Sequence, residues 1–474
     1  MAIDGLRGEL ILSSNEYDVI IIGAGPSGIF AAMELCKQKN GLKILVLEKG
    51  KDINQRKCFV KSGESSCLHC KPCLLICGFG GAGAFSDGKL TLSPQFGGVL
   101  SDYVSSEVVE ELINYVDQEY LSYGAPADLY GADDETTKDL KRQAATADLN
   151  LIPAQIRHLG TENCNLILTR MREKLEQQID IRTSEGVKEI LVEDGKAKGV
   201  LTEEDQTYLS PCVICGPGRA GAEWFLQETK KLGLRGVNNP VDIGVRVEVP
   251  GVTMEHLTAK LYESKLVYYS PSFDDRVRTF CMNPFGEVVA ENNNGLITVN
   301  GHSYAHKQTA NTNFALLVSK MFTEPFREPI RYGKYIASLA NMLGDGVLIQ
   351  RLGDLLEGRR STQDRIDRGL VNPTMPQATP GDLSLVLPYR HLTSLLEMLE
   401  ALDKVAPGVN SRHTLLYGVE VKFYSYRLEL TPALETQIEN LFAVGDGAGV
   451  TRGLVQASAS GVIAAREVLE RMEN

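Results

Sequence analysis

The sequence predicts an α/β fold in which one parallel sheet draws its strands from both ends of the chain. Residues 17–50 have the order strand, glycine-rich turn, helix, strand, and the C-terminal part returns to that order. Between these parts, residues 240–370 hold several β-strand patterns, which predicts an inserted α+β domain. A chain of 474 residues is long enough for two such domains.

The predicted parallel-sheet domain is discontinuous, and a cysteine-rich insertion at residues 58–77 interrupts it. Its segments are residues 1–100, 150–240 and 410–474. A helical insertion is expected over residues 101–149, because apolar residues recur at helical spacing from 107 to 116. Residues 241–409 are expected to form the second, α+β domain.

Within this second domain the patterns predict strands, a helical part and a polar connection. The expected strands cover residues 243–249, 266–269 and 296–299, and the helical part lies near 311–358. A polar stretch with prolines at 373, 376 and 380 follows, and it is interpreted as a connection between domains.

Composition and charge exclude several classes of protein. The net charge of −12 argues against a nucleic acid or an anionic membrane as the main partner, since both require basic patches. No apolar run approaches the ~20 residues of a membrane-spanning helix. Residues 1–16 lack a basic segment followed by an apolar one, so we expect no export signal and a cytoplasmic location.

The N-terminal motif predicts a dinucleotide-binding turn. A buried strand over residues 17–22 runs into a glycine-rich turn and then a helix, whose N-terminal amides suit phosphates. The first glycine of the turn permits the tight bend, the second admits the pyrophosphate, and the third allows close packing of helix and strand. The next strand ends about 20 residues on in an acid, as a ribose partner should be placed. The expected cofactor-binding residues here are Gly23, Ala24, Gly25, Pro26, Ser27, Gly28, Glu48 and Lys49.

The C-terminal motif decides between FAD and NAD. The strand 440–444 enters a glycine-rich turn that resembles the second FAD fingerprint of the glutathione-reductase-like superfamily. That resemblance implies that Asp446 binds the ribityl chain, which NAD lacks, and that the following helix points its N-terminus at the flavin pyrimidine edge. The alternative reading makes Asp446 a turn residue. The cofactor-binding residues expected in this part are Gly445, Asp446, Gly453, Leu454 and Gln456.

A third glycine cluster, Gly216-Pro217-Gly218, follows a meander of short strands with a hairpin turn at Asp194-Gly195. It resembles the segment at which FAD proteins re-enter the cofactor domain, and its three residues are expected to bind the cofactor. No acid follows at the spacing that a separate NAD(P)H domain requires. A separate NAD(P)H domain is therefore the alternative, and NAD(P)H is also left open as a transient donor over the flavin.

Four cysteines, Cys67, Cys70, Cys73 and Cys77, follow one another at intervals of three, three and four residues. Compact thiolate loops of this kind are typical of a [4Fe–4S] cluster. The fourth ligand is left open between Cys77, Cys58 and Cys281. Zinc, thiol redox chemistry and unligated cysteines remain alternatives.

A run of five glycines over residues 78–90 comes directly after the cysteines. Bare backbone amides suit close approach to a flat ring or a phosphate, although a flexible loop is the alternative. The expected cofactor contacts are Gly80, Gly81, Gly83, Ala84 and Ser86. A cluster held by the cysteines would then lie close to the flavin and could exchange electrons with it.

With these motifs in place, the sequence resembles a family of FAD-utilising dehydrogenases related to geranylgeranyl-reductase-like flavoproteins. The segments that carry the resemblance are residues 80–90, 156–161, 215–221, 242–250, 300–303 and 445–461. The resemblance implies a glutathione-reductase-like FAD domain with an inserted cap domain, and redox chemistry without a stated substrate. The turn Asn283-Pro284-Phe285-Gly286 departs from the Cys-Pro-Gly-Gly-like turn expected there, which leaves the role of this loop open.

The sequence thus predicts an FAD-dependent oxidoreductase acting on an organic small molecule. The iron–sulfur centre would receive single electrons from a ferredoxin-like carrier. His158 and Arg452 are the candidate catalytic residues, as proton donor or substrate anchor, with a turn residue and a charge pair as the alternative readings. Two other functions stay open: an NAD(P)H:acceptor flavoprotein with zinc or thiols at the cysteine run, and an electron-transfer partner without a small-molecule substrate.

Overall fold

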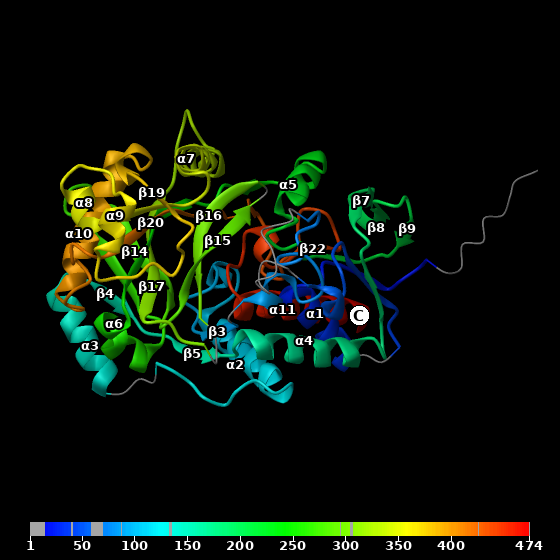
Figure 1. The fold of residues 1–474 in the computed structure, drawn as a ribbon. Helices are drawn as coiled ribbons and strands as arrows, with labels where there is room; N and C mark the ends of the chain where they lie inside the picture. Colours follow the sequence, from blue (N-terminus) through cyan, green and yellow to red (C-terminus); the bar gives the residue numbers. More distant parts are fainter. Residues whose placement is uncertain are drawn as a thin grey trace, which may run out of the picture.

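Two sheets with separate hydrophobic cores organise the molecule (Figure 1). The computed structural model describes residues 15–38, 41–57, 70–86, 88–131, 135–293, 295–303, 307–424 and 426–473. In Figure 1 the segments from both ends of the chain, in blue and red, lie together, and the middle of the chain forms the other half.

The first sheet is parallel and five-stranded, and it contains strands from the beginning, middle and end of the chain. Its order is β22 (Leu441–Ala443), β10 (Val213–Cys215), β1 (Val19–Ile22), β2 (Ile44–Glu48) and β6 (Asp180–Thr183). All residues of its first four strands in this order are buried, as in parallel sheets covered on both faces. The structure thus confirms a mixed α/β fold in which both ends of the chain share one parallel sheet.

Helices α1 (Pro26–Gln38) and α11 (Leu454–Glu473) pack against each other beside this sheet, with α2 (Ser106–Ser122) against α11. Glycines allow the close approach. A Cβ at Gly461 would lie 2.0 Å from the carbonyl oxygen of Ser27, and one at Gly28 would lie 1.9 Å from that of Gly23. The turn after β1 and the two helices are therefore held in one arrangement.

The second sheet is mainly antiparallel and has eight strands. Its order is β19 (Thr379–Pro380), β18 (Leu348–Arg351), β20 (Leu415–Lys422), β12 (Val241–Pro250), β17 (Asn311–Lys320), β14 (Arg276–Asn283), β13 (Lys265–Tyr269) and β4 (Asn150–Ile152). Apolar residues at alternate positions of β12 join a core with α6 (Gly251–Leu261), α7 (Pro329–Gly344) and α10 (Tyr389–Asp403). Three of the other positions of β12 carry buried charged groups, those of Asp242, Arg246 and Glu248, so the two faces of this sheet differ in chemistry.

The remaining elements are short sheets and helices around these two units. The small sheets are β3 (Lys89–Leu92) with β5 (Gln155–His158), β7 (Val187–Glu193) with β8 (Lys196–Thr202) and β9 (Thr207–Leu209), β11 (Gly236–Val237) with β21 (Arg427–Leu428), and β15 (Glu287–Asn293) with β16 (Leu296–His302). The other α-helices are α3 (Glu135–Thr146), α4 (Thr161–Leu175), α5 (Ala222–Lys231), α8 (Leu352–Leu356) and α9 (Gln363–Asp367). The predicted hairpin turn at Asp194-Gly195 joins β7 to β8, with φ of 51° and 74°.

Two predictions for the second domain are wrong in part, although the helices α7 and α8 do lie within the range 311–358. The expected helical part near residues 311–358 begins with the strand β17, which lies between β12 and β14 and is almost entirely buried. A continuous apolar run fits a buried strand as well as a helix, so its period does not decide between them. The polar stretch ends in β19, which pairs with β18 at the edge of the sheet instead of connecting two domains.

No helix in the described part of the chain has the length and hydropathy needed to cross a bilayer.

Candidate functional site

The turn that follows β1 has the geometry that its glycines predict. Gly23 has a φ of 93°, donates to the carbonyl of Leu47 at 2.7 Å, and has no room for a Cβ, which would lie 2.3 Å from the carbonyl oxygen of Gly216. Pro26 then begins α1. Because the first turn of a helix lacks intrahelical acceptors for its amides, this end of α1 is suited to an anion.

The glycine run 78–86 packs on this turn. Gly80 donates to the carbonyl of Ala24 at 2.7 Å, and a Cβ on Gly81 would lie 3.1 Å from the Cα of Gly25. A Cβ on Gly83 would lie 2.7 Å from the side chain of Leu454, at the start of α11. Farther along, Ala84 is buried in the 3-10 helix 81–85, and Ser86 donates to the carbonyl of Gly83. These contacts contradict a free linker for residues 78–86.

Glu48 ties three backbone segments together at the end of β2. Its buried carboxylate accepts from the amides of Ala24 at 2.9 Å, Gly50 at 2.8 Å and Gly78 at 2.9 Å. A carboxylate has about four acceptor positions, which leaves room for one further donor such as a ribose hydroxyl. Glu48 therefore holds the backbone of the site in place, in addition to its predicted contact with a ribose.

Replacing Glu48 by glutamine tests this arrangement. One of its oxygens becomes an NH2 group that faces backbone donors, so we expect E48Q to lower the free energy of unfolding by about 2 kcal/mol. Urea unfolding measured by circular dichroism gives the value. The exposed Glu255 provides the matched control, E255Q, which should leave the free energy of unfolding unchanged. An unchanged stability of E48Q would contradict the structural role.

The C-terminal turn lies beside the third glycine cluster. A Cβ on Gly447 would lie 2.6 Å from Cγ of Pro217 and 3.0 Å from the amide nitrogen of Gly218. The hydroxyl of Ser27 occupies the space that Gly216 and Gly445 leave, 2.8 Å and 2.7 Å from where their Cβ atoms would be. On the same side, Lys49 donates to the carbonyl of Ala220 at 3.0 Å. Segments about 420 residues apart in the chain thus meet in one place.

Asp446 brings a carboxylate into this cradle. Its Oδ1 accepts from the hydroxyl of Thr451 at 2.7 Å. Burial raises the pKa of Asp446, and the positive charges of Arg219 and Arg452 and the Thr451 hydrogen bond only partly offset this effect. The ionised carboxylate therefore lowers the stability of the ligand-free protein, and residues with such perturbed pKa values are typical of functional sites.

The N-terminus of α11 is connected to the loop 93–99. A Cβ on Gly453 would lie 3.2 Å from the Cα of Gly97. Gln456 donates to the carbonyls of Pro94 at 3.0 Å and Phe96 at 2.6 Å, and its Oε1 accepts from the amide of Leu100 at 3.3 Å. The side chain of Gln456, which we expected to contact cofactor, thus holds this loop.

The described residues fit a flavin dinucleotide. Glycine-rich turns follow β1, β10 and β22 at their carboxyl ends, where parallel α/β sheets bind their ligands. The turns leave backbone without side chains, and the half-buried carboxylate of Asp446 stands among them. This combination suits a diphosphate with a sugar alcohol attached.

The polar face of the eight-stranded sheet was not predicted from the sequence. Asp242 accepts from Arg278 at 2.6 Å and from the hydroxyl of Tyr424 at 2.5 Å. Although burial opposes ionisation, Arg278 and these hydrogen bonds lower the pKa of Asp242. The guanidinium of Arg452 lies over the ring of Tyr424, 3.9 Å from its centre, and donates to Asn239 at 3.3 Å. Arg452, the residue expected to anchor substrate, therefore contacts this polar face through Tyr424.

A second group on the same face centres on Arg246. This guanidinium is completely buried and donates twice to Glu420, at 2.7 and 2.8 Å, and also to Asn313 and the carbonyl of Cys281. Lys422 also pairs with Glu420, at 2.9 Å. The alternation of charged and apolar residues over 242–249 was the available signal, but alternation also describes a strand with one face in water.

His158 lies where β5 meets the second unit. Its Nε2 is 3.0 Å from the hydroxyl of Tyr262, and the two ring centres are 4.7 Å apart. In the neighbouring strand β3, Lys89 pairs with His158 in register and forms an ion pair with Glu263 at 3.3 Å. His158 and Arg452 thus have different partners: His158 contacts α6, and Arg452 contacts the loop after β20.

The described cysteines do not form the expected cluster site. Cys58 and Cys67 lie outside the described residues, Cys70 is exposed, and Cys77 is buried. In the described ranges, no group of three or more His, Cys, Asp or Glu side chains is placed to hold a metal ion. Cys281 lies on β14, where its carbonyl accepts from Arg246. The iron–sulfur cluster therefore has no support from the described residues and stays a prediction.

Arg56 shapes the loop after these cysteines. It donates to the carbonyls of Leu74 at 3.0 Å, Leu75 at 2.9 Å and Phe79 at 2.6 Å. Burial lowers the pKa of Arg56 to about 10, and burial raises the pKa of Cys77. A raised pKa lowers the fraction of thiolate at Cys77.

Comparisons of the sequence with known protein families also point to FAD as the cofactor. Residues 240–423 match the family described as FAD-dependent protein, C-terminal domain-like, and residues 7–53 match the Thi4 family. The chain is 27% identical to an uncharacterised protein of Clostridium beijerinckii, over 96% of this chain and 81% of that protein.

Among solved structures, the chain is similar to a formate oxidase of Aspergillus oryzae, with a TM-score of 0.46 and 11% identity over 97% of this chain and 99% of the oxidase. It is also similar to the L-proline dehydrogenase from P. horikoshii, with a TM-score of 0.43 and 11% identity over 96% and 94% of the two chains. TM-scores this low define neither the fold nor the reaction of this chain. By its sequence, the central part of the chain is similar to the C-terminal domain of FAD-dependent proteins, while a geranylgeranyl-reductase-like subfamily stays a prediction.

Proposed function

We propose that this protein is an FAD-dependent oxidoreductase that transfers a hydride between FAD and an organic small molecule. The observation that carries the proposal is the meeting of the turns after β1, β10 and β22 with the glycine run 78–86, with the half-buried Asp446 in the last of these turns. The match of residues 240–423 to FAD-dependent proteins supports the choice of cofactor.

The chain offers a binding group for each part of FAD. The turn Gly23–Gly28 and the N-terminus of α1 suit the diphosphate, and Glu48 suits the adenosine ribose. Asp446 suits the ribityl hydroxyls, and the N-terminus of α11 favours negative charge at the pyrimidine edge. When bound, FAD supplies the hydride chemistry, and the protein orients and tunes it. This assignment corresponds to a glutathione-reductase-like arrangement.

The substrate side is proposed on the polar face of the eight-stranded sheet. Arg452, exposed at its guanidinium and stacked on Tyr424, is suited to anchor an anionic group. His158 and the hydroxyl of Tyr262 share a hydrogen bond at 3.0 Å, so either group can hold a proton for a nearby reacting atom.

An anaerobic absorption spectrum of the purified protein tests the proposal. We expect flavin bands that bleach with dithionite, and FAD in the supernatant after heat denaturation. Titration with NADH and NADPH under the same conditions shows whether a nicotinamide donates the hydride. Protein that stays colourless after reconstitution with FAD would overturn the proposal.

The predicted iron–sulfur relay, with its ferredoxin-like donor, is tested separately by metal analysis. If the prediction holds, anaerobically purified protein contains four iron atoms and four acid-labile sulfides per chain, the content of a [4Fe–4S] cluster. Chelation of the metal should remove the broad absorbance and leave the flavin bands. Zinc in place of iron, or no metal, would contradict the relay and leave the flavin proposal intact. As a control, serine substitution of Cys36, which lies outside the cysteine run, should leave the iron and sulfide content unchanged.

A further inference from the structure

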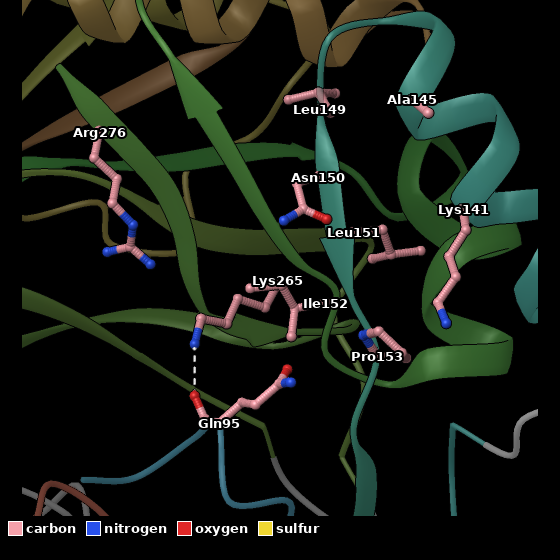
Figure 2. A pocket seen from close by; sticks show the side chains of 10 residues that line it. All are labelled: Gln95, Lys141, Ala145, Leu149, Asn150, Leu151, Ile152, Pro153, Lys265 and Arg276. Atoms are coloured by element: carbon pink, nitrogen blue, oxygen red, sulfur yellow. Dashed lines mark hydrogen bonds between the residues drawn. The ribbon is translucent and has the colours of Figure 1, made fainter. Parts of the chain in front are cut away.

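A basic pocket lies between the eight-stranded sheet and the loop after β3 (Figure 2). It has a volume of about 640 Å³, and ligand pockets of small molecules typically span about 300–1,000 Å³. Of the ten described residues that line it, three are cationic and none is acidic. The cations are Lys141 on α3, Lys265 on β13 and Arg276 on β14, so elements distant in sequence supply the charge.

Two carboxylates near the pocket, those of Glu263 and Asp242, are already paired elsewhere. Glu263 forms its ion pair with Lys89 at 3.3 Å, and Asp242 pairs with Arg278 at 2.6 Å. Lys265 donates to the backbone carbonyl of Gln95 at 3.1 Å, which satisfies one donor without neutralising the charge. The pocket therefore keeps a positive charge that a bound anion would balance.

The positive charge around the pocket affects the pKa of Lys265. Burial lowers its pKa to about 8, and the neighbouring charges of Arg278, Arg276 and Arg452 act in the same direction, while Glu263 opposes them. An ammonium group with a depressed pKa in a cationic surrounding is stabilised by a nearby anion. Lys141 faces the same space from α3.

Apolar residues line the pocket beside Lys265, which pairs in register with Ile152 of the neighbouring strand β4. Leu149, Ile152 and Pro153 line the pocket from β4 and its flanks, and Asn150 adds one amide (Figure 2). An apolar lining of this kind binds hydrocarbon, whereas a site for a bare inorganic ion needs polar groups on all sides. The lining thus fits a molecule with an anionic head and an apolar body.

The pocket is linked to the N-terminus of α11 through one residue. Gln456 holds the carbonyls of Pro94 and Phe96, on both sides of the pocket residue Gln95. Under the proposed function, that helix end faces the flavin. The cationic side of the pocket, where Lys265 contacts Gln95, therefore lies on the loop that this helix end holds.

We propose that this pocket binds the anionic head, a carboxylate or a phosphate, of an organic substrate whose apolar part lies along Leu149, Ile152 and Pro153. The role as substrate subsite rests on the proposed function, while binding of the anion does not.

Isothermal titration calorimetry of the FAD-loaded protein with octanoate, octyl phosphate and octanol tests the proposal. We expect at least one of the two anions to bind about tenfold or more tightly than neutral octanol, with affinity falling as salt is added. A tighter octyl phosphate assigns a phosphate head, and a tighter octanoate assigns a carboxylate. Octanol binding as tightly as both anions, or no binding of any probe, would overturn the proposal. This comparison uses the unaltered chain.

The variant K265Q/R276Q should weaken the tighter anion about tenfold or more, whereas the exposed Lys404 gives a matched control, K404Q, without effect. At pH 9, above the pKa of Lys265, binding should take up protons in the unaltered protein and fewer in K265Q, as seen by calorimetry in buffers of different ionisation enthalpy. Unchanged affinity and proton uptake in the variants would reject these residues as the site. Flavin content of each sample separates the two proposals: anion binding without flavin contradicts the proposed function, and flavin without anion binding contradicts only this inference.

Discussion

Replacing Arg246 by methionine is expected to lower the free energy of unfolding by about 3–5 kcal/mol, because it leaves a buried carboxylate with one partner fewer. Arg246 and Glu420 are both completely buried, and two hydrogen bonds of 2.7 and 2.8 Å join them. The substitution also removes the donor to Asn313 and to the carbonyl of Cys281. Lys422, 2.9 Å from Glu420, retains part of the charge balance and limits the loss.

A double-mutant cycle separates the charge pair from the packing. In R246M/E420L neither charge remains alone, so we expect the double variant to be more stable than the sum of the single effects predicts. Urea unfolding of the four proteins without flavin provides the free energies. R246K serves as a control for charge, since lysine cannot reproduce the bidentate contact. Strictly additive effects of R246M and E420L would show that the two groups are not coupled.

Replacing Asp446 by alanine is expected to weaken FAD binding about thirtyfold, the equivalent of about 2 kcal/mol for a lost hydrogen bond to a charged group. Asp446 is the carboxylate among the glycine turns, and its Oδ1 is already oriented by Thr451 at 2.7 Å. Titration of the flavin-free protein with FAD, followed by flavin fluorescence, gives the dissociation constant. D446N keeps an acceptor oxygen and should lose less affinity.

The same substitution should not weaken the flavin-free fold. Burial raises the pKa of Asp446 above its value in the unfolded chain, so the folded protein binds more protons and its stability falls as the pH rises between the two values. At neutral pH the ionised group therefore opposes folding, and D446A should unfold at the same temperature as the parent or at a higher one. This difference should vanish below about pH 3.9, the ordinary pKa of aspartic acid.

A lower unfolding temperature of flavin-free D446A would assign a structural role to Asp446. The substitution D364A, at an exposed aspartate on α9, is the matched control for both measurements. Equal FAD affinity in D446A and the parent would remove the main support for the flavin site.

The motifs at the two ends of the chain could be predicted because their physics is local. A buried strand, a glycine at a positive φ and a helix start are each determined by a few consecutive residues. For this reason the strands before Gly23 and Gly445 and the hairpin at Asp194-Gly195 are found where the sequence predicts them. The strand β17 was mistaken for helix because its apolar residues are continuous, and only its neighbours β12 and β14 make it a strand.

The sequence by itself determined the glycine turns, the acids that follow the strands and a parallel sheet shared by both ends. Only the tertiary structure decided what those acids contact, that the charged residues of 242–249 are buried with partners on other segments, and that Lys141, Lys265 and Arg276 line one pocket. The reason is the range of the interactions. Backbone conformation depends on adjacent residues, whereas ion pairs and cavities join side chains that lie far apart in the sequence. Along a single strand, a charged side chain that is buried in an ion pair cannot be distinguished from one that faces water.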